Sequence, residues 1–401
     1  MNILVIDDDA FVLKLLKHQL AQLGFQDIAV FQAAEAALGA MTNDTKSVDL
    51  VFCDIQMPEM DGVELIRHLD SVEYRGGLVL ISGEDERILS TVQSLAQAHG
   101  LKILTALRKP TTLEQLQRIL EQHNSLSALP LYSARKIYSV EEVRRGIRGG
   151  ELINHYQPKV RLPSGEVTGV EVLVRWQHPE DGLVLPDQFI DTAEEHGLID
   201  ELTRIVLVKA LQDCWHWQQA NLSLSIAVNI SISNLNSVDY PDFIVQSAKE
   251  AGVDLSNVVL EVTESQLMHN PLTVLDILTR LRLKNITLSI DDFGTGHSSL
   301  TQLRDIPFNE LKVDAGFVHD ACHQPARRAI LEASFDMARR LGMKTAAEGV
   351  ENLDDWRFLT MQVKCDIAQG YFIAKPMPAG ELFDWMQEWE ARRPSLMGFK
   401  P

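Results

Sequence analysis

The sequence contains few cysteines, no long hydrophobic run and comparatively few basic residues. Its four cysteines, at positions 53, 214, 322 and 365, are scattered and lack the paired spacing of a metal site. We therefore expect reduced cysteines in the core of a cytoplasmic protein. No segment approaches the ~18 apolar residues that a membrane helix needs, and the first residues lack the basic stretch of a signal peptide.

The chain is strongly acidic, with 56 Asp and Glu against 37 Lys and Arg and a net charge of −19. This surplus makes a broad contact with DNA or with an anionic membrane unfavourable. An anionic ligand would need a local positive centre, such as a metal ion. With 401 residues and 45% hydrophobic content, the chain is expected to hold more than one globular domain.

The first 124 residues alternate five times between strand-like and helix-like segments. The predicted strands are Ile3–Ile6, Ile28–Phe31, Leu50–Cys53, Leu78–Ile81 and Lys102–Leu107, and the predicted helices are Ala10–Leu23, Ala33–Met41, Gly62–Leu69, Arg87–His99 and Leu113–Gln122. Strict alternation predicts an α/β fold with a doubly wound parallel sheet covered on both faces. Gly24 is expected to end the first helix, and Thr112 with Gln115 to cap the last.

Polar side chains follow several of these strands. Asp7 and Asp8 follow the first strand, and Asp54 follows the third. Ser82 and Lys109 follow the fourth and fifth. In a flavodoxin-like strand order the first and third strands are neighbours, and ligands bind at the carboxyl ends of the strands. The three carboxylates would then form a pocket suited to Mg²⁺, with a hydroxyl and an ammonium group at its rim.

These segments resemble the receiver domain of two-component response regulators. The matching stretches are VIDDD, CDIQMPEMDG, ISGED and RKP. The resemblance implies a sensor histidine kinase as partner and Asp54 as phosphoacceptor, with one Mg²⁺ on Asp7, Asp8 and Asp54 and with Ser82 and Lys109 as switch residues. Receivers usually carry an aromatic switch residue three positions before the lysine, where this chain has Ala106. A receiver-like fold that is never phosphorylated is the alternative.

Residues 125–138 are predicted to form a linker, because they contain Ser and Pro without clear periodicity. A second domain is expected over residues 139–401, starting with a helix capped by Ser139 and Glu142. Its alternating pattern and length suit a (β/α)₈ barrel. The predicted strands are Gly169–Val174, Ser225–Ile230, Val258–Val262, Leu288–Ile290, Leu311–Val313, Lys344–Ala347 and Ile367–Phe372.

The stretch Thr287–Leu300, TLSIDDFGTGHSSL, ends an apolar run in two adjacent carboxylates, Asp291 and Asp292. Two such charges repel each other and resist burial unless a cation lies between them. A solvated turn rich in Asp and Gly has the same composition. Taken alone, the stretch leaves both interpretations open.

Every predicted strand of the second domain carries or precedes a polar side chain. These are Glu171, Asn229, Glu261, Asp291 with Asp292, Lys312, Glu348 and Gln369. In a barrel they converge at the carboxyl ends of the strands, where active sites form. The five carboxylates and one lysine leave about four negative charges, which would repel a phosphate. Two divalent cations ~3.5–4 Å apart, bridged by Asp291, would neutralise them and promote displacement at phosphorus.

The second domain resembles EAL-type cyclic di-GMP phosphodiesterases over essentially its whole length. The matching stretches are YQPKV, EVLVRW, VNIS, LEVTES, DDFGTGHSSL, LKVD, AEGVE and AQGYFIAKPMP. The resemblance implies a modified TIM barrel that hydrolyses cyclic di-GMP to linear pGpG with two Mg²⁺ or Mn²⁺ ions. The implied metal ligands are Glu171, Asn229, Glu261, Asp291, Asp292 and Glu348.

The same resemblance assigns roles around the metal ligands. Glu171, Lys312 and Glu348 are the implied catalytic residues, with Lys312 holding the nucleophilic water and Glu348 as general base. Gln369 would contact the reacting centre and Arg175 a phosphate of the ligand. Glu264 would hold the DDFGTG loop, which the family uses at a dimer interface, so a homo-oligomer is expected.

Two positions depart from the family pattern: Val172 replaces the usual Ala, and His297 the usual Tyr. Neighbouring strand residues point to opposite faces, so Val172 should point away from Glu171 and leave the chemistry intact. The favoured function is a phosphodiesterase regulated by phosphorylation of Asp54. The alternatives are a cyclic di-GMP sensor without hydrolysis, which loss of a metal ligand would mark, and a protein-interaction scaffold. The sequence has no helix-turn-helix segment, so DNA binding is not expected. It has no GGDEF-like segment either, so synthesis of the dinucleotide is not expected.

Overall fold

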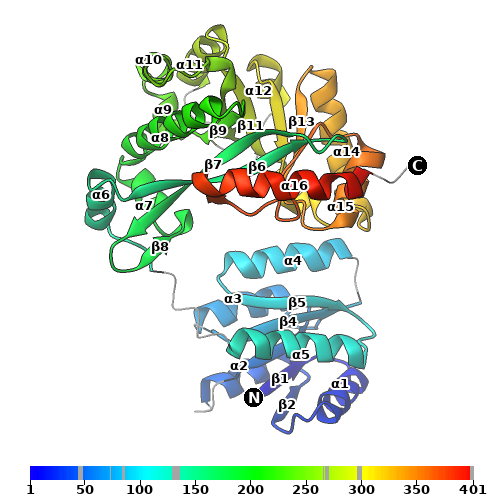
Figure 1. Cartoon of the computed structure of the whole chain (residues 1–401). Helices are drawn as coiled ribbons and strands as arrows, with labels where there is room; N and C mark the ends of the chain where they lie inside the picture. Colours follow the sequence, from blue (N-terminus) through cyan, green and yellow to red (C-terminus); the bar gives the residue numbers. More distant parts are fainter. Residues whose placement is uncertain are drawn as a thin grey trace. The chain divides into compact units, whose positions relative to one another are not determined.

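The protein is described from a computed structural model that covers residues 1–43, 48–72, 74–83, 86–128, 136–264, 266, 271–295 and 300–397. The chain divides into two compact units, Met1–Ala134 and Arg135–Pro401. They are called the smaller and the larger unit below, and each is described by itself (Figure 1).

The smaller unit contains one five-stranded parallel sheet in the order β2-β1-β3-β4-β5. Its strands are β1 (Ile3–Ile6), β2 (Ile28–Phe31), β3 (Leu50–Asp54), β4 (Gly77–Ser82) and β5 (Lys102–Arg108), and its helices are α1 (Ala10–Gln22), α2 (Ala34–Asn43), α3 (Gly62–Ser71), α4 (Glu86–Ala98) and α5 (Leu113–Ala128). The predicted doubly wound order is confirmed, and it places β1 directly beside β3.

Two apolar layers hold this sheet, one on each face. Alternate strand residues such as Leu4 and Val51 pack toward α2, α3 and α4, and their neighbours such as Val5 and Phe52 pack toward α1 and α5. This division follows from the period of two along a strand. Because both faces are covered, these strands are apolar almost throughout, as is typical of parallel sheets.

The helix ends follow the local sequence signals. Gly24 adopts φ +94° just after α1, a left-handed conformation that glycine tolerates without a steric cost. Thr112 and Gln115 exchange the hydrogen bonds of a capping box at the start of α5. Helix α5 continues to Ala128, so the first residues of the predicted linker are helical instead. Residues 129–135 of that linker lie outside the described part of the chain.

The larger unit is an eight-stranded closed barrel, as the predicted TIM-like fold requires. Its strands are β6 (Leu152–Arg161), β7 (Val167–His178), β9 (Ser225–Asn229), β10 (Val258–Thr263), β11 (Thr287–Phe293), β12 (Glu310–Val313), β13 (Lys344–Ala347) and β14 (Ile367–Ala368), and β8 (Gly182–Val184) and β15 (Met377–Pro378) pair at its edge. The barrel closes through β6, which runs antiparallel to both β7 and β14. This antiparallel strand is missing from the set of strands predicted from the sequence.

Helices cover the outside of the barrel (Figure 1). They are α6 (Val140–Arg148), α7 (Ile190–Glu195), α8 (Ile199–Gln219), α9 (Ile232–Leu235), α10 (Tyr240–Ala251), α11 (Pro271–Leu283), α12 (Leu300–Asp305), α13 (Ala315–Val318), α14 (Pro325–Arg340), α15 (Leu353–Phe358) and α16 (Leu382–Met397). Helix α6 begins with the predicted capping box of Ser139 and Glu142. None of the described helices combines the length and the apolar character needed to cross a membrane.

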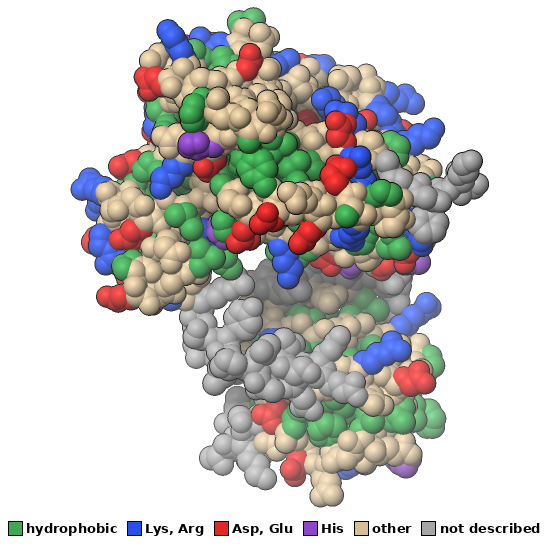
Figure 2. All heavy atoms as spheres, in the orientation of Figure 1, with side chains coloured by type: hydrophobic (Ala, Val, Ile, Leu, Met, Phe, Trp, Pro, Cys, Tyr) green, Lys and Arg blue, Asp and Glu red, His purple; other side chains and the backbone are tan. Residues whose placement is uncertain are grey.

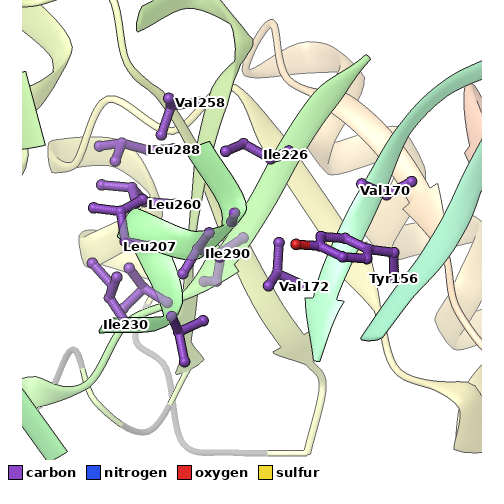
Figure 3. Packing of buried hydrophobic residues seen from close by; sticks show 14 of the residues in the cluster. Tyr156, Val170, Val172, Leu207, Ile226, Ile230, Val258, Leu260, Leu288 and Ile290 are labelled. Carbon is purple, nitrogen blue, oxygen red and sulfur yellow. The ribbon is translucent and has the colours of Figure 1, made fainter. Parts of the chain in front are cut away.

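The hydrophobic core of the larger unit lies between the strands and this helical layer. Figure 3 shows side chains from β9, β10 and β11, such as Ile226, Leu260 and Ile290, gathered with Leu207 of α8. The alternate residues of the same strands therefore face the barrel interior, and many of them are polar. On the visible outer face, charged side chains of both signs surround a group of hydrophobic ones above α16 (Figure 2).

The last barrel strand is shorter than predicted. It ends at Ala368 rather than continuing to Phe372, so Gln369 follows the strand instead of lying within it. The chain turns at Gly370, where φ is +156° and an added Cβ would lie 2.2 Å from the backbone nitrogen of Val350. Only glycine fits this close approach of two backbone segments.

Candidate active site

A polar pocket lies at the carboxyl ends of β1, β3 and β5 in the smaller unit. Lys109 Nζ lies 2.7 Å from Asp54 Oδ2 and 2.7 Å from Asp7 Oδ2. Carboxylate oxygens of Asp7, Asp8 and Asp54 lie within 4.8 Å of one another. Asp7 and Asp54 are buried, and Asp8 is exposed. The pocket thus has the hard oxygen donors that Mg²⁺ prefers, with one open side.

The remaining switch positions of the smaller unit also lie at the ends of the strands. Ser82 is fully buried at the last residue of β4. Ala106 is half-buried on β5, beside Leu80 of β4. With a methyl group at position 106, no aromatic ring can move between an inward and an outward position there.

The side chain of Lys312 lies among the carboxylates inside the barrel of the larger unit. Its ammonium group lies 2.5 Å from Glu348, 3.0 Å from Asp291 and 3.0 Å from Glu261. Glu171 is at 3.7 Å, and the lysine side chain itself is only 1% exposed. Burial acts to lower the pKa of Lys312, but the surrounding carboxylates outweigh it and raise the pKa well above its ordinary value. This lysine therefore stays charged and holds four carboxylates together.

A second buried lysine, Lys159 of β6, belongs to the same site. Its ammonium group contacts Glu261, which is fully buried between Lys159 and Lys312. Burial acts to raise the pKa of Glu261, but the two lysines lower it to about 2. The charge predicted from the sequence therefore needs correction: five carboxylates and two lysines leave about three negative charges.

Lys159 was missed because its strand was not recognised. The motif YQPKV that contains it lies on β6, where Gln157 and Lys159 share the inward face opposite Glu171 and Gly169 of β7. The alternation of apolar Tyr156 and Val160 with these two polar residues was the available signal.

A hydrogen-bonded chain fixes Glu171. Its Oε1 accepts from Asn229 Nδ2 at 2.9 Å, and its Oε2 accepts from Gln369 Nε2 at 2.6 Å. Gln369 also donates to Gln157 Oε1 at 2.9 Å. The remaining carbonyl oxygen of Gln369 is buried without a hydrogen-bond partner. A buried acceptor without a partner is costly, so this atom fits a ligand or water placed beside it.

The carboxylates of the barrel form two triads suited to divalent cations. Glu171, Glu261 and Asp291 form one, Asp291, Asp292 and Glu348 form the other, and in each the oxygens lie within 4.8 Å of one another. Asp291 is common to both. Burial, with the nearby carboxylates of Asp291 and Glu171, raises the pKa of Glu348 above its usual range against the pull of Lys312. Five like charges, three of them buried and two partly exposed, fit a site that binds cations.

Two further predicted residues lie near this centre. Glu264 Oε2 accepts a hydrogen bond of 2.8 Å from the backbone nitrogen of Gly294, so it contacts the start of the DDFGTG loop. Arg175 is half-buried on β7, and its guanidinium donates to the backbone oxygen of Val174. Val172 packs in the outer hydrophobic core, on the face opposite Glu171. His297 lies outside the described residues.

Comparison with known families and proteins identifies the domain in each unit. A model described as the EAL domain matches residues 140–376, and a model described as the response regulator receiver domain matches residues 3–121. The chain belongs to the EAL family. It carries the EAL domain in the larger unit and the receiver domain in the smaller unit.

Relatives with similar sequences include three that differ in how much of their length is matched. Cyclic di-GMP phosphodiesterase RocR of Pseudomonas aeruginosa is 33% identical over 392 residues, which cover 96% of this chain and 98% of RocR. Cyclic di-GMP phosphodiesterase PdeR of Escherichia coli is 36% identical, over 62% of this chain and 38% of PdeR. The structure of the PaMucR phosphodiesterase in complex with c-di-GMP has a TM-score of 0.58 and 38% identity, over 61% of this chain and 98% of that one.

The pKa of Asp292 gives a pH-dependent prediction for the EAL domain. Burial, then Asp291 and Asp314, raise this pKa from 3.8 to about 6. A carboxylate with a raised pKa contributes stability at low pH and loses it as the pH rises through 6. In metal-free protein, Asp292→Asn should raise the free energy of unfolding at pH 8 by up to about 3 kcal/mol, and this gain should fade toward pH 4.

Denaturant unfolding of the chelator-treated protein across this pH range measures the effect. Asp292 has φ +53°, a conformation that asparagine also tolerates, so the replacement adds no backbone strain. Asp276→Asn, at an exposed position of α11, is the control and should not reproduce the gain at pH 8. A gain that is equal at pH 4 and pH 8 would disprove the assignment.

A second prediction concerns Lys159. Lys159→Met leaves the buried Glu261 with one ammonium group instead of two, and breaking a buried pair typically costs ~3–5 kcal/mol. We expect a loss of this order in the free energy of unfolding, measured in chelator. The double variant Lys159→Met/Glu261→Gln should recover part of it, because the buried charge that lost one of its two lysine partners is gone. Strictly additive effects would show that the two side chains do not interact.

Proposed function

We propose that the EAL domain hydrolyses cyclic di-GMP to linear pGpG. The observation that carries this proposal is the pair of carboxylate triads that share Asp291 inside the barrel. The triads lie in an EAL domain whose receiver-containing relative RocR is named as a cyclic di-GMP phosphodiesterase and matches almost the whole chain. All six side chains expected as metal ligands are present, which argues against a sensor that has lost its chemistry.

Two divalent cations, Mg²⁺ or Mn²⁺, would bind at these triads. Glu171, Asn229, Glu261 and Asp291 would hold one, and Asp291, Asp292 and Glu348 would hold the other. When bound, they would supply positive charge for the phosphodiester and lower the pKa of a water molecule. In the receiver domain, Asp7, Asp8 and Asp54 would hold one Mg²⁺.

The protein groups would bind and orient the substrate and move one proton. Water adds its hydroxyl to phosphorus, the bond to the ribose 3′ oxygen breaks, and a proton goes to that oxygen. The carboxylate of Glu348 would act as the general base and accept the proton of the attacking water. It lies 2.5 Å from the ammonium group of Lys312. Lys312 would hold this water, and the free carbonyl oxygen of Gln369 would face the reacting centre. Arg175 would bind a phosphate.

Hydrolysis is tested by incubating the purified full-length protein with cyclic di-GMP and separating the products by chromatography. We expect pGpG with Mg²⁺ or Mn²⁺ and none after chelation. Ca²⁺ should not restore the activity, because it is larger, prefers more ligands and polarises water less. Binding of cyclic di-GMP without any pGpG under saturating Mn²⁺ would favour the non-catalytic sensor instead.

The receiver domain would regulate this activity. We propose that a sensor histidine kinase phosphorylates Asp54, whose carboxylate lies at the open pocket beside Lys109. We also propose a homo-oligomer, with the Glu264-anchored loop near the contact between subunits. Size-exclusion chromatography with light scattering would test the oligomer, and a monomer at all concentrations would contradict it.

A further inference from the structure

A cluster of sulfur, nitrogen and oxygen donors lies in the connection between β12 and α14. The Cys322 thiol, a ring nitrogen of His323 and a carboxylate oxygen of Asp320 all lie within 4.8 Å of one another. Of the potential ligand clusters among the described residues, this one contains cysteine and histidine, whereas the others contain carboxylates alone. It includes none of the residues assigned to hydrolysis or to phosphorylation.

The backbone of this connection brings the three residues together. The backbone nitrogens of His323 and Gln324 both donate to the carbonyl oxygen of Asp320, at 3.1 and 3.2 Å, and close a tight turn. Gln324 Nε2 also donates to Asp320 Oδ2 at 3.1 Å, which orients the carboxylate. The thiol of Cys322 is half-buried and the imidazole of His323 is exposed, so an ion could reach both from solvent.

Carboxylates lie next to the cluster. Asp355 is 1% exposed and accepts the backbone N–H of Asp320 at 3.0 Å. Burial, and then the carboxylates of Asp355, Asp320 and Asp354, raise the pKa of the Cys322 thiol above its ordinary value. The same negative field that disfavours a bare thiolate favours a divalent cation at this place.

We propose that Asp320, Cys322 and His323 form a binding site for a zinc-class transition metal. Thiolate, imidazole and carboxylate are the donors of zinc sites, and donors within 4.8 Å of one another need only small side-chain rotations to bind one central ion at ~2.0–2.3 Å. The softer sulfur and nitrogen donors discriminate against Mg²⁺ and Mn²⁺, which prefer oxygen. Binding releases the thiol proton to solvent, so the metal–sulfur bond replaces the sulfur–hydrogen bond. Water would complete the coordination.

Cys322 therefore differs from the core cysteine that the sequence predicted. Cys53, Cys214 and Cys365 are buried, whereas Cys322 is partly exposed next to two potential co-ligands. Binding of the ion does not depend on the proposed hydrolysis. The expected role is structural, because it would link residues of one short connection.

Co²⁺ titration of the full-length, chelator-treated protein tests the site. Co²⁺ bound by a thiolate gives a near-ultraviolet charge-transfer band, which the oxygen ligands of the EAL and receiver sites cannot produce. We expect this band in the wild type, its loss in Cys322→Ala, and at least about tenfold weaker Co²⁺ binding in His323→Ala. Zn²⁺ should displace the Co²⁺ and remove the band.

Two matched variants are the controls. Cys214→Ala removes a buried thiol of α8, and His196→Ala removes an exposed imidazole next to α7. Both should retain the wild-type band and affinity. A wild type without the band, or a band that persists in Cys322→Ala, overturns the proposal. Retention of the wild-type affinity in His323→Ala would also overturn the three-ligand site.

Discussion

Replacing Glu348 with alanine should lower cyclic di-GMP hydrolysis by at least about 10²-fold, the usual loss on removing a general base. The side chain lies 2.5 Å from Lys312 and shares a carboxylate triad with Asp291 and Asp292. Its removal therefore takes away both the proposed proton acceptor and a proposed metal ligand. Turnover measured at saturating Mn²⁺ and substrate, with the pGpG product quantified by chromatography, checks the size of the loss.

The loss should not come from unfolding. The pKa of Glu348 is raised, so its ionised form destabilises the metal-free fold at neutral pH, and Glu348→Ala or Glu348→Gln should unfold no more readily than the wild type. Glu166→Ala, in an exposed ion pair with Arg161, is the control and should keep its activity. A Glu348 variant that retains more than about a tenth of the wild-type rate would refute the role.

The second large effect is expected from Asp54. Phosphorylation adds about −1.5 to −2 charges in a pocket where Lys109 already pairs with Asp54 and Asp7. The new oxygens should attract Lys109 and the hydroxyl of Ser82, and so shift the segments that follow β4 and β5. Because Ala106 cannot provide a moving ring, we expect α4 itself to carry the change. Coupling of this kind is typically worth ~1–3 kcal/mol, which corresponds to about 5–150-fold.

The measurement compares hydrolysis rates with and without a small-molecule phosphodonor, in the wild type and in Asp54→Asn. The rates should differ in the wild type and agree in the variant. Asp27→Asn, at an exposed position before β2, is the control and should respond as the wild type does. Equal rates in every condition, with the wild-type phosphorylation verified by mass, would leave the receiver domain as a docking or dimerisation module.

Much of the site was predictable because its polar residues lie at the carboxyl ends of parallel strands, and the topology of the sheet brings these ends together. Parallel strands place their carboxyl ends at the same edge, so Asp7 and Asp54 had to meet once β1 and β3 were neighbours. In the barrel the same logic brought Glu171, Glu261 and Asp291 within 4.8 Å of one another. An apolar run that ends in a carboxylate is visible in the sequence without any knowledge of distant contacts.

The misplaced boundaries have local causes. Strand β14 stops at Ala368, because the backbone has to pass close to Val350 at Gly370. Helix α5 continues into the predicted linker as far as Ala128, where Ser residues and the lack of clear periodicity suggested a loop. These polar residues have weak helix propensity, and propensity alone rarely fixes where a helix ends.

The sequence by itself determined the two domains, the polar residue at each parallel strand end and the surplus of negative charge that favours cations. Only the tertiary structure decided which positive groups offset that charge. Lys159 reaches Glu261 because β6 runs antiparallel and closes the barrel. The physical reason is that a polar residue at the end of an apolar run can be recognised from neighbouring residues alone. A contact between side chains of different barrel strands depends on how the strands pair and in which register.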